Sequence, residues 1–317
     1  GDDQWSNILS GADLIRRKTP ASPVNRAGYR LAGTLGPDYL DLARLVAGSE
    51  GTLALITEAV LATQPLPRCR GVALLLFDSL EKACRAVMEV LPTQPSACDL
   101  MDRRHLSLAR ETEARFDAIL PPDTEAALLV EHEGNRLHEV RRQLRQLVDE
   151  IHQKHRLSFA ARQAFDAAEV GLVWHLAHRI TPTLYRKSAS RPVPVIEDVA
   201  VPPEILPEFL VRMQNVLKRH QVIAATFAHA GQGQLHIQPF LNLAAPEDVA
   251  KMQALAGDLY DEVLGVGGTI SAEHACGLSR TPFLRRQYGE LYDVFWAIKR
   301  AFDPQNVLNP GKIVSGE

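Results

Sequence analysis

The sequence predicts an α+β protein in which helices cover an antiparallel sheet. Between residues 71 and 160 the hydrophobic pattern gives strand, helix, strand, strand, helix and strand, in that order. This β-α-β-β-α-β order is typical of the ferredoxin-like fold. The length of 317 residues, with 46% hydrophobic and 23% charged residues, suits one large globular domain or two modest ones.

Each element of this order has a local signal. The run GVALLLF at residues 71–77 is apolar throughout, as in a buried strand, and Ser79 is a candidate N-cap for the next helix. The segments ACDLMD and AALLVEHEG read as two further short strands. Apolar residues recur at helical spacing from Leu137 to His155, which predicts an amphipathic helix. A last strand is expected near residues 157–160.

Further helices are expected at residues 164–179, 203–220, 245–264 and 285–302, and a strand in VPVIEDVAVP. Glu197 and Asp198 stand among the apolar residues of that strand. Because an unpaired buried carboxylate is costly, each should face solvent at a strand end or have a cationic partner.

Composition limits the function. The 35 basic and 38 acidic residues are spread along the chain and leave a net charge of -3, so nucleic acid is not expected as a partner. The four cysteines lack metal-type spacing, and no stretch resembles a signal peptide, which indicates a cytoplasmic protein. The apolar runs are shorter than the roughly 20 residues of a spanning helix. Peripheral attachment to the inner face of the membrane and homodimer formation stay open.

Two histidines flank the glycine-rich turn of FAHAGQGQLHIQPF, residues 227–240. If Ala224–Ala228 and Leu235–Phe240 pair as a hairpin, His229 and His236 lie at the two sides of its loop. Cross-strand Cβ atoms are about 4.5–5.5 Å apart, so both imidazoles could bind one divalent ion. This spacing has no unique meaning, and two solvated or core-capping histidines are the alternative.

A second polar cluster is GGTISAEHACGLSR, residues 267–280. The glycines around Glu273 and His274 allow a ligand to approach the backbone, and the pair could supply one metal ligand and one base. In an extended chain, neighbouring side chains point to opposite faces, so the two are not expected to share a role. An ordinary polar loop is the alternative.

Two turns complete the motifs. The amide groups of GSEGTL, residues 48–53, could bind an anionic or polar ligand, although the turn lacks the spacing of the common nucleotide-binding loops. The segment DPQNVLNPGK, residues 303–312, predicts a helix end and a proline-glycine turn.

Taken in order, GSEGTLALITEAVL, EDVAVPPEILPEF, HAGQGQLHIQPF, GGTISAEHACG and FDPQNVLNPGKI resemble the FAD-linked oxidases of the vanillyl-alcohol-oxidase (PCMH-type) superfamily. NRAGYRL followed by RLVAGSEGTL is most similar to the D-2-hydroxy acid dehydrogenases fused to an iron–sulfur domain. The resemblance implies that residues 1–67 end a FAD-binding domain and that residues 68–280 form the ferredoxin-like substrate or cap domain. Residues 281–317 would be a C-terminal helix and turn returning to the flavin domain.

The resemblance also implies a site. His229, His236 and Glu273 would bind a divalent ion, zinc or manganese, and His274 would be the catalytic base. The family's FAD diphosphate loop and cysteine-rich iron–sulfur segment are not among these residues, so a piece of a longer protein is expected, and this piece need not retain FAD. The residues implied to approach the flavin lie mainly in the two turns: Gly48, Ser49, Glu50, Gly51, Thr52, Ile56 and Asn309.

The chain departs from the family pattern in three places, one of which is the loop around Glu273 and His274. In that loop the usual residues are replaced by Ala272, Ala275 and Cys276. Ala177 stands three residues after Trp174, where relatives carry an arginine for the substrate carboxylate. Arg179 is therefore a candidate partner of that carboxylate, and Arg280 and Arg191 are others. Gln232 and Gln234 replace an acid and an asparagine in the turn between the histidines.

The resemblance implies a fragment of a FAD-dependent enzyme that oxidises a small 2-hydroxy acid of the D-lactate, glycolate and D-2-hydroxyglutarate class. The substrate would transfer a hydride to FAD, and the electrons would pass to an iron–sulfur domain or another acceptor protein. Two alternatives stay open: a catalytically altered member that serves as an assembly or binding module, and a flavin-independent metal hydrolase.

Overall fold

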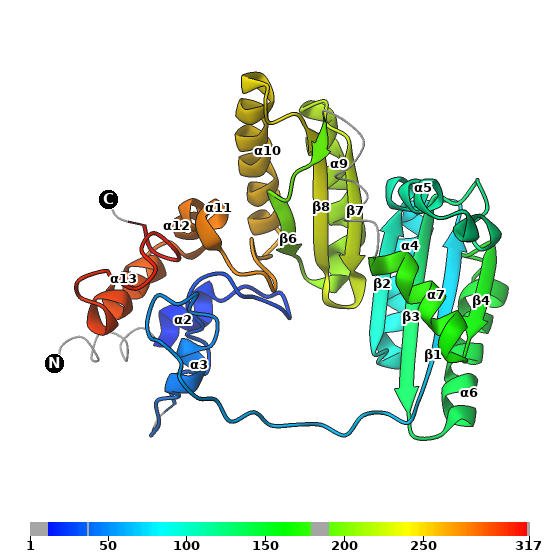
Figure 1. Ribbon diagram of the computed structural model, residues 1–317, viewed down its shortest axis with the longest axis horizontal. Helices are drawn as coiled ribbons and strands as arrows, with labels where there is room; N and C mark the ends of the chain where they lie inside the picture. Colours follow the sequence, from blue (N-terminus) through cyan, green and yellow to red (C-terminus); the bar gives the residue numbers. More distant parts are fainter. Residues whose placement is uncertain (1–11, 37, 179–189, 316–317) are drawn as a thin grey trace. The chain divides into compact units, whose positions relative to one another are not determined.

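The computed structural model describes residues 12–36, 38–178 and 190–315, which fold into two compact units (Figure 1). Within the described residues, no helix combines the length and the apolar character needed to cross a membrane. The segment from Val263 to Arg280, which the sequence assigns to the substrate domain, folds with the N-terminal residues. Unit 1 comprises Gly1–Thr63, Asp198–Ala200 and Val263–Glu317, and unit 2 comprises Gln64–Glu197 and Val201–Glu262.

The strands of the sheet are β1 (Cys69–Phe77), β2 (Ala97–Asp102), β3 (Ala126–Gly134), β4 (Ala160–Ala164), β5 (Arg191–Pro192), β6 (Ile196–Ala200), β7 (Ala224–His229) and β8 (Gln234–Leu241). Their order is β4-β1-β3-β2-β7-β8-β5, with β6 paired to β8, and the neighbours along this path are antiparallel. The predicted α+β class with an antiparallel sheet is confirmed. Strand β4 begins three residues later than expected, because Leu157 donates its N–H to Ile151 and ends the preceding helix.

The long helices that accompany this sheet are α4 (Leu80–Val90), α5 (Arg103–Thr112), α6 (Leu137–Val148), α7 (Ala167–His178), α9 (Leu206–Arg219) and α10 (Pro246–Gly265). Ser79 caps α4 as predicted, since its side chain accepts from the N–H of Lys82 at 3.2 Å. Short helical turns are η1 (Leu91–Thr93), η2 (Ala114–Ala118), η3 (Asp149–Lys154), η4 (Pro203–Ile205) and η5 (Ala230–Gln232).

Strand β1 is buried on both faces. Val72, Leu74 and Leu76 belong to a hydrophobic cluster with residues of α5 and α7, while α4 and α6 also pack against β1 and β3 (Figure 1). Alternate residues of a strand point to opposite faces, so the continuous apolar run GVALLLF supplies both layers. The sheet therefore has helices on two faces, and it holds the β7–β8 hairpin at one side of β2.

Unit 1 is built from short helices and long loops around an aromatic cluster. The ring centroid of Phe295 lies 5.5 Å from that of Tyr29 and 5.0 Å from that of Tyr288. The helix expected at residues 285–302 is interrupted, because Gly289 has φ +56°. The helices of this unit are α2 (Ala12–Lys18), α3 (Leu42–Val46), α11 (Gly277–Arg280), η6 (Thr281–Phe283), α12 (Leu284–Tyr288) and α13 (Leu291–Phe302).

A buried histidine of α5 makes the stability of unit 2 depend on pH. The ring of His105 stacks on Phe227, and burial lowers the pKa of His105 to about 4. An unfolded histidine titrates near its usual pKa of about 6.5, so the unfolded state binds more protons between the two values. The contribution of neutral His105 is present above about pH 6.5 and is lost as the pH falls toward 4, by up to about 3 kcal/mol.

We therefore expect the difference in unfolding free energy between His105→Phe and wild type to shift in favour of the variant as the pH falls from about 7 to about 5. Burial raises the pKa of Asp102 to about 6, so the contribution of Asp102 to stability increases as the pH falls. Because both proteins contain Asp102, most of this contribution cancels when their unfolding free energies are subtracted. Urea unfolding at several pH values checks it, with His138→Phe on the exposed face of α6 as control. If the difference in unfolding free energy between His105→Phe and wild type does not change with pH, the lowered pKa of His105 is wrong.

Candidate functional site

The two histidines of the hairpin lie on neighbouring strands but are not direct partners. His229 pairs with Gln234 and His236 pairs with Phe227, so the histidines are diagonal neighbours on one face. Their ring centroids are 5.3 Å apart with the planes at 85°, and a nitrogen of one ring lies within 4.8 Å of a nitrogen of the other. The hairpin thus brings both predicted ligands together within unit 2.

The glycine-rich turn is required by the backbone at Gly233. This residue has φ +69°, and a Cβ placed on it would lie 2.0 Å from the carbonyl oxygen of Val201. A backbone atom cannot move aside as the end of a flexible side chain can, so only glycine fits. Gly231, in the same turn, would place its Cβ 3.3 Å from the Cβ of Cys98.

We expect Gly233→Ala to lower the unfolding free energy by more than the roughly 1–2 kcal/mol that left-handed backbone costs a non-glycine residue. The steric overlap with Val201 adds to this cost. Denaturant unfolding of Gly233→Ala and of the control Gly231→Ala measures the difference. Equal stability of the two variants would show that the turn relaxes without cost.

Each hairpin histidine is fixed through its Nδ1 atom. His229 Nδ1 lies 2.8 Å from Oδ1 of Asp99 on β2, and His236 Nδ1 contacts the carbonyl oxygen of Glu197. A carbonyl or a carboxylate accepts, so Nδ1 donates in both rings and Nε2 carries the lone pair. This is the tautomer in which a histidine binds a metal ion through Nε2. The donor set therefore fits a divalent ion.

The partner Asp99 was not predicted from the sequence. It is 2% exposed, and its second oxygen, Oδ2, is buried without a hydrogen-bond partner among the described residues. Such an orphaned oxygen costs stability, so the residue is expected to serve a function. The available signal was an acid inside the apolar strand segment ACDLMD. Glu197, which the sequence singled out only as a carboxylate within a strand, is a further candidate ligand, since one of its carboxylate oxygens lies within 4.8 Å of a His236 ring nitrogen.

In unit 1, Glu273 and His274 lie in a loop and not in a strand. The predicted opposite orientation of their side chains is wrong, because His274 Nε2 lies 3.4 Å from Oε1 of Glu273. The next residue, Ala275, has φ +65°, so the chain turns where the prediction assumed extended backbone. Glu273, predicted as the third ion ligand, belongs to a different unit from the histidines, and the three-residue ion site stays a prediction.

Asp198, in the same unit, does not face solvent. It is 0% exposed, and backbone N–H groups of the loop at residues 272–274 donate to its carboxylate. The sequence suggested solvent or a cationic partner, and it did not anticipate partners from the backbone. Neutral N–H donors can satisfy a buried carboxylate when several converge on it.

The GSEGTL turn is held by the C-terminal residues of unit 1. Lys299 is 1% exposed and its Nζ donates to the carbonyl oxygen of Thr52 at 2.8 Å and to Oδ2 of Asp303 at 2.6 Å. Asn309 Nδ2 donates to the carbonyl oxygen of Glu50 at 2.6 Å. The structure therefore places the two predicted flavin-facing turns beside each other.

The side chains of this turn differ in exposure. Ser49 and Thr52 are buried, whereas Ile56 is 67% exposed. A Cβ on Gly48, which has φ +84°, would meet nothing within 4 Å, and one on Gly51 would meet only Asn309 at 4.0 Å. The backbone at these two glycines is therefore accessible, so a flat cofactor could lie directly against it. Their contact with FAD stays a prediction.

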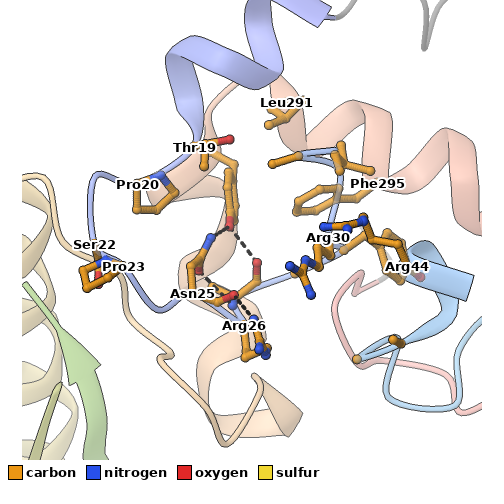
Figure 2. Close-up of a pocket in the computed structure, with 18 residues that line it drawn as sticks. Thr19, Pro20, Ser22, Pro23, Asn25, Arg26, Arg30, Arg44, Leu291 and Phe295 are labelled. Atoms are coloured by element: carbon orange, nitrogen blue, oxygen red, sulfur yellow. Dashed lines mark hydrogen bonds between the residues drawn. The ribbon is translucent and has the colours of Figure 1, made fainter. Parts of the chain in front are cut away.

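A pocket of about 330 Å³ lies next to Gly48 in unit 1, and its lining includes Arg26, Arg30 and Arg44, which are labelled in Figure 2. Burial, together with the neighbouring Arg44 and Arg26, lowers the pKa of Arg30. Arg44 is already paired with Asp41 at 3.4 Å, so Arg26 and Arg30 are the guanidinium groups that an anionic ligand could contact.

Of the predicted partners for a substrate carboxylate, Arg179 lies outside the described residues. Arg280 is 5% exposed, and its Nη1 donates to the carbonyl oxygen of Ala275 at 3.0 Å, which braces the loop that carries His274. Ala177 is buried in the hydrophobic cluster of unit 2. The substrate roles of the two arginines stay predictions.

Residues 66–313 match the family described as FAD linked oxidases, C-terminal domain. The chain is 31% identical over 315 residues to D-2-hydroxyglutarate dehydrogenase of Pantoea ananatis, covering 95% of this chain and 31% of that protein. It is 27% identical over 309 residues to glycolate oxidase subunit GlcD of Bacillus subtilis, covering 96% of this chain and 61% of the relative. The chain therefore belongs to the FAD-linked oxidase family, and it spans less than two thirds of these relatives.

Solved structures show the same fold. p-Cresol methylhydroxylase with substrate bound matches with a TM-score of 0.58 and 15% identity, over 79% of this chain and 54% of that one. Alkyldihydroxyacetonephosphate synthase matches with a TM-score of 0.54 and 17% identity, over 88% of this chain and 51% of that one. The PCMH-type resemblance is thereby confirmed at the level of the fold. Membership in a FAD-linked family favours a flavin-dependent protein over a flavin-independent hydrolase.

Proposed function

We propose that the complete protein containing this chain is a flavin- and metal-dependent dehydrogenase that oxidises a small 2-hydroxy acid to the 2-oxo acid. The proposal depends on one observation: the Nδ1 atoms of His229 and His236 are hydrogen-bonded to Asp99 and to the carbonyl oxygen of Glu197, which puts the lone pair of each ring on Nε2, the atom that would bind an ion. Relatives named D-2-hydroxyglutarate dehydrogenase and glycolate oxidase subunit support the substrate class. An electron-accepting iron–sulfur domain or protein completes the proposal.

The residues divide the chemistry between them. His229, His236 and Glu273 would hold the divalent ion, which supplies a Lewis acid for the substrate oxygens. His274 takes the proton of the 2-hydroxyl group, and the electron density left on that oxygen favours departure of the hydrogen on C2 with its electron pair. FAD, when bound beside the GSEGTL turn, supplies the two-electron acceptor. Arg179 or Arg280 would bind the substrate carboxylate and orient C2.

The arginine pocket beside Gly48 adds a place for an anionic group next to the flavin-facing turn. Its guanidinium groups come from Arg26, Arg30 and Arg44 (Figure 2). A phosphate or carboxylate group carries the charge and the acceptor oxygens that such groups bind best. This contact is part of the proposal.

The test is anaerobic mixing of the complete, FAD-loaded protein with a panel of D- and L-2-hydroxy acids. We expect loss of the oxidised flavin absorbance with one stereochemical series and formation of the matching 2-oxo acid. Flavin that is bound but is reduced by no 2-hydroxy acid would reject the dehydrogenase and favour a binding or assembly module. The buried Ala177 at the usual arginine position is the observation that keeps this second candidate in view.

A further inference from the structure

The loop that carries Glu273 and His274 is organised around a buried carboxylate 75 residues earlier in the chain. Asp198 is 0% exposed. Its Oδ2 atom accepts from the Ser271 hydroxyl at 2.7 Å, from the N–H of Ala272 at 3.0 Å and from the N–H of His274 at 2.9 Å. Its Oδ1 atom accepts from the N–H of Glu273 at 3.0 Å. Three consecutive amides and one hydroxyl therefore converge on one side chain.

A second carboxylate holds the far end of the same loop. Glu50, itself at φ +55°, accepts from the N–H of Cys276 and from the N–H of Gly277, both at 2.8 Å. Between the two anchors stands Ala275, whose carbonyl oxygen accepts from Arg280 at 3.0 Å. All these residues belong to unit 1.

Consecutive backbone N–H groups that point into one hollow usually bind an external anion. Here the anion is a side chain of the protein. Hydrogen bonds to an ionised acceptor are roughly twice as strong as bonds between neutral groups. Ala275 has a left-handed φ of +65°, which the backbone adopts only when its surroundings impose it. The carboxylate of Asp198 supplies that constraint on the side of Glu273 and His274.

We propose that Asp198 is a positioning residue that sets the direction of the Glu273 and His274 side chains through their backbone amides, with Glu50 securing the other end of the loop. The inference rests on the proposed function, because it concerns the same base and ion ligand. Oxygen and nitrogen atoms of Asp198, Glu273 and His274 also lie within 4.8 Å of one another. Asp198 nevertheless acts as an anchor and not as an ion ligand, since N–H dipoles that favour an anion there oppose a cation.

The isosteric change Asp198→Asn removes the charge and turns an NH2 group toward N–H donors. A displacement of about 1 Å in a catalytic group can cost roughly 100-fold in rate, so we expect flavin reduction to slow by about that factor. Because His274 acts in the transition state, kcat should fall and KM should change little. Ser271→Ala removes one donor to Asp198 and also the hydroxyl contact with the carbonyl oxygen of Ala275 at 2.8 Å, and it should have a smaller effect in the same direction.

The experiment uses the complete, FAD-loaded protein as wild type, Asp198→Asn, Ser271→Ala and Asp198→Glu, with Asp293→Asn as control. Asp293 pairs with Arg285 at the surface and is 65% exposed. FAD content, flavin reduction with the best 2-hydroxy acid, and amide hydrogen exchange of residues 272–274 are measured together. We expect unchanged FAD content in all variants and a loss of kcat that is larger in Asp198→Asn than in Ser271→Ala. Amide exchange at residues 272–274 should be faster by about tenfold or more in Asp198→Asn.

A folded Asp198→Asn protein that keeps the wild-type kcat and wild-type amide protection overturns the proposal. If that variant does not fold, Ser271→Ala decides in the same way. If the wild type reduces its flavin with no 2-hydroxy acid, the proposed function fails. Comparing amide protection of residues 272–274 in wild type and in Asp198→Asn then still shows whether Asp198 fixes the loop, so the two failures are distinguishable.

Discussion

Replacing His274 with alanine is expected to slow substrate-dependent flavin reduction by about 100- to 10,000-fold, the usual contribution of a general base. The imidazole is well placed for proton transfer because its side chain is 42% exposed while its backbone N–H is held by Asp198 at 2.9 Å. The measurement is the rate of flavin reduction under anaerobic conditions in the complete protein, at saturating substrate.

His138→Ala, on the exposed face of α6, is the matched control and should keep the wild-type rate. His274→Gln keeps much of the volume but cannot take up the proton, so it should be as slow as the alanine variant. Wild-type flavin reduction in either variant would remove His274 as the base. Loss of FAD from the variant would instead show that the residue supports cofactor binding.

Replacing His229 or His236 with alanine is expected to release the divalent ion and to stop flavin reduction. Removal of a partner that merely orients a metal-binding histidine costs roughly 10- to 100-fold in affinity, so loss of a direct ligand should cost more. Metal content and flavin reduction are measured on the same samples, before and after treatment with a chelator.

His155→Ala is the control for this experiment, because His155 lies 3.5 Å from Glu89 and 3.3 Å from Glu150 in another acid–histidine group of unit 2. That variant should keep its ion and its rate. Asp99→Asn should lower the ion affinity by about 10- to 100-fold and recover activity at high ion concentration. An unchanged ion content in His229→Ala would contradict the assigned site.

The sequence was sufficient for the elements whose pattern is local. The apolar run of β1, the cap at Ser79 and the hairpin around Gly233 all follow from neighbouring residues. Helix α5 was missed because RRHLSLARET has only three apolar residues. Its buried face consists of His105, Leu106 and Ala109. Gly289 divides a helix whose apolar spacing alone predicts one continuous element.

The site was predictable only in part, for a physical reason. The two histidines and the Glu273–His274 pair stand in recognisable motifs. Their supporting carboxylates come from elsewhere in the chain: Asp99 is 130 residues from His229, and Asp198 is 76 residues from His274. No local pattern encodes such contacts, since they exist only after the sheet and the loop have formed. The diagonal arrangement of His229 and His236 likewise depends on how strands β7 and β8 pair, which the spacing of the two histidines in the sequence does not reveal.

The central claim is that the hairpin histidines hold an ion needed for flavin-dependent oxidation of a 2-hydroxy acid. One measurement tests it most directly: anaerobic flavin reduction by the complete protein, with metal content determined on the same sample, before chelation, after chelation and after return of zinc or manganese. We expect reduction to be lost with the ion and restored with it in wild type, and not restored in His229→Ala. Full flavin reduction by metal-free wild-type protein would contradict the claim.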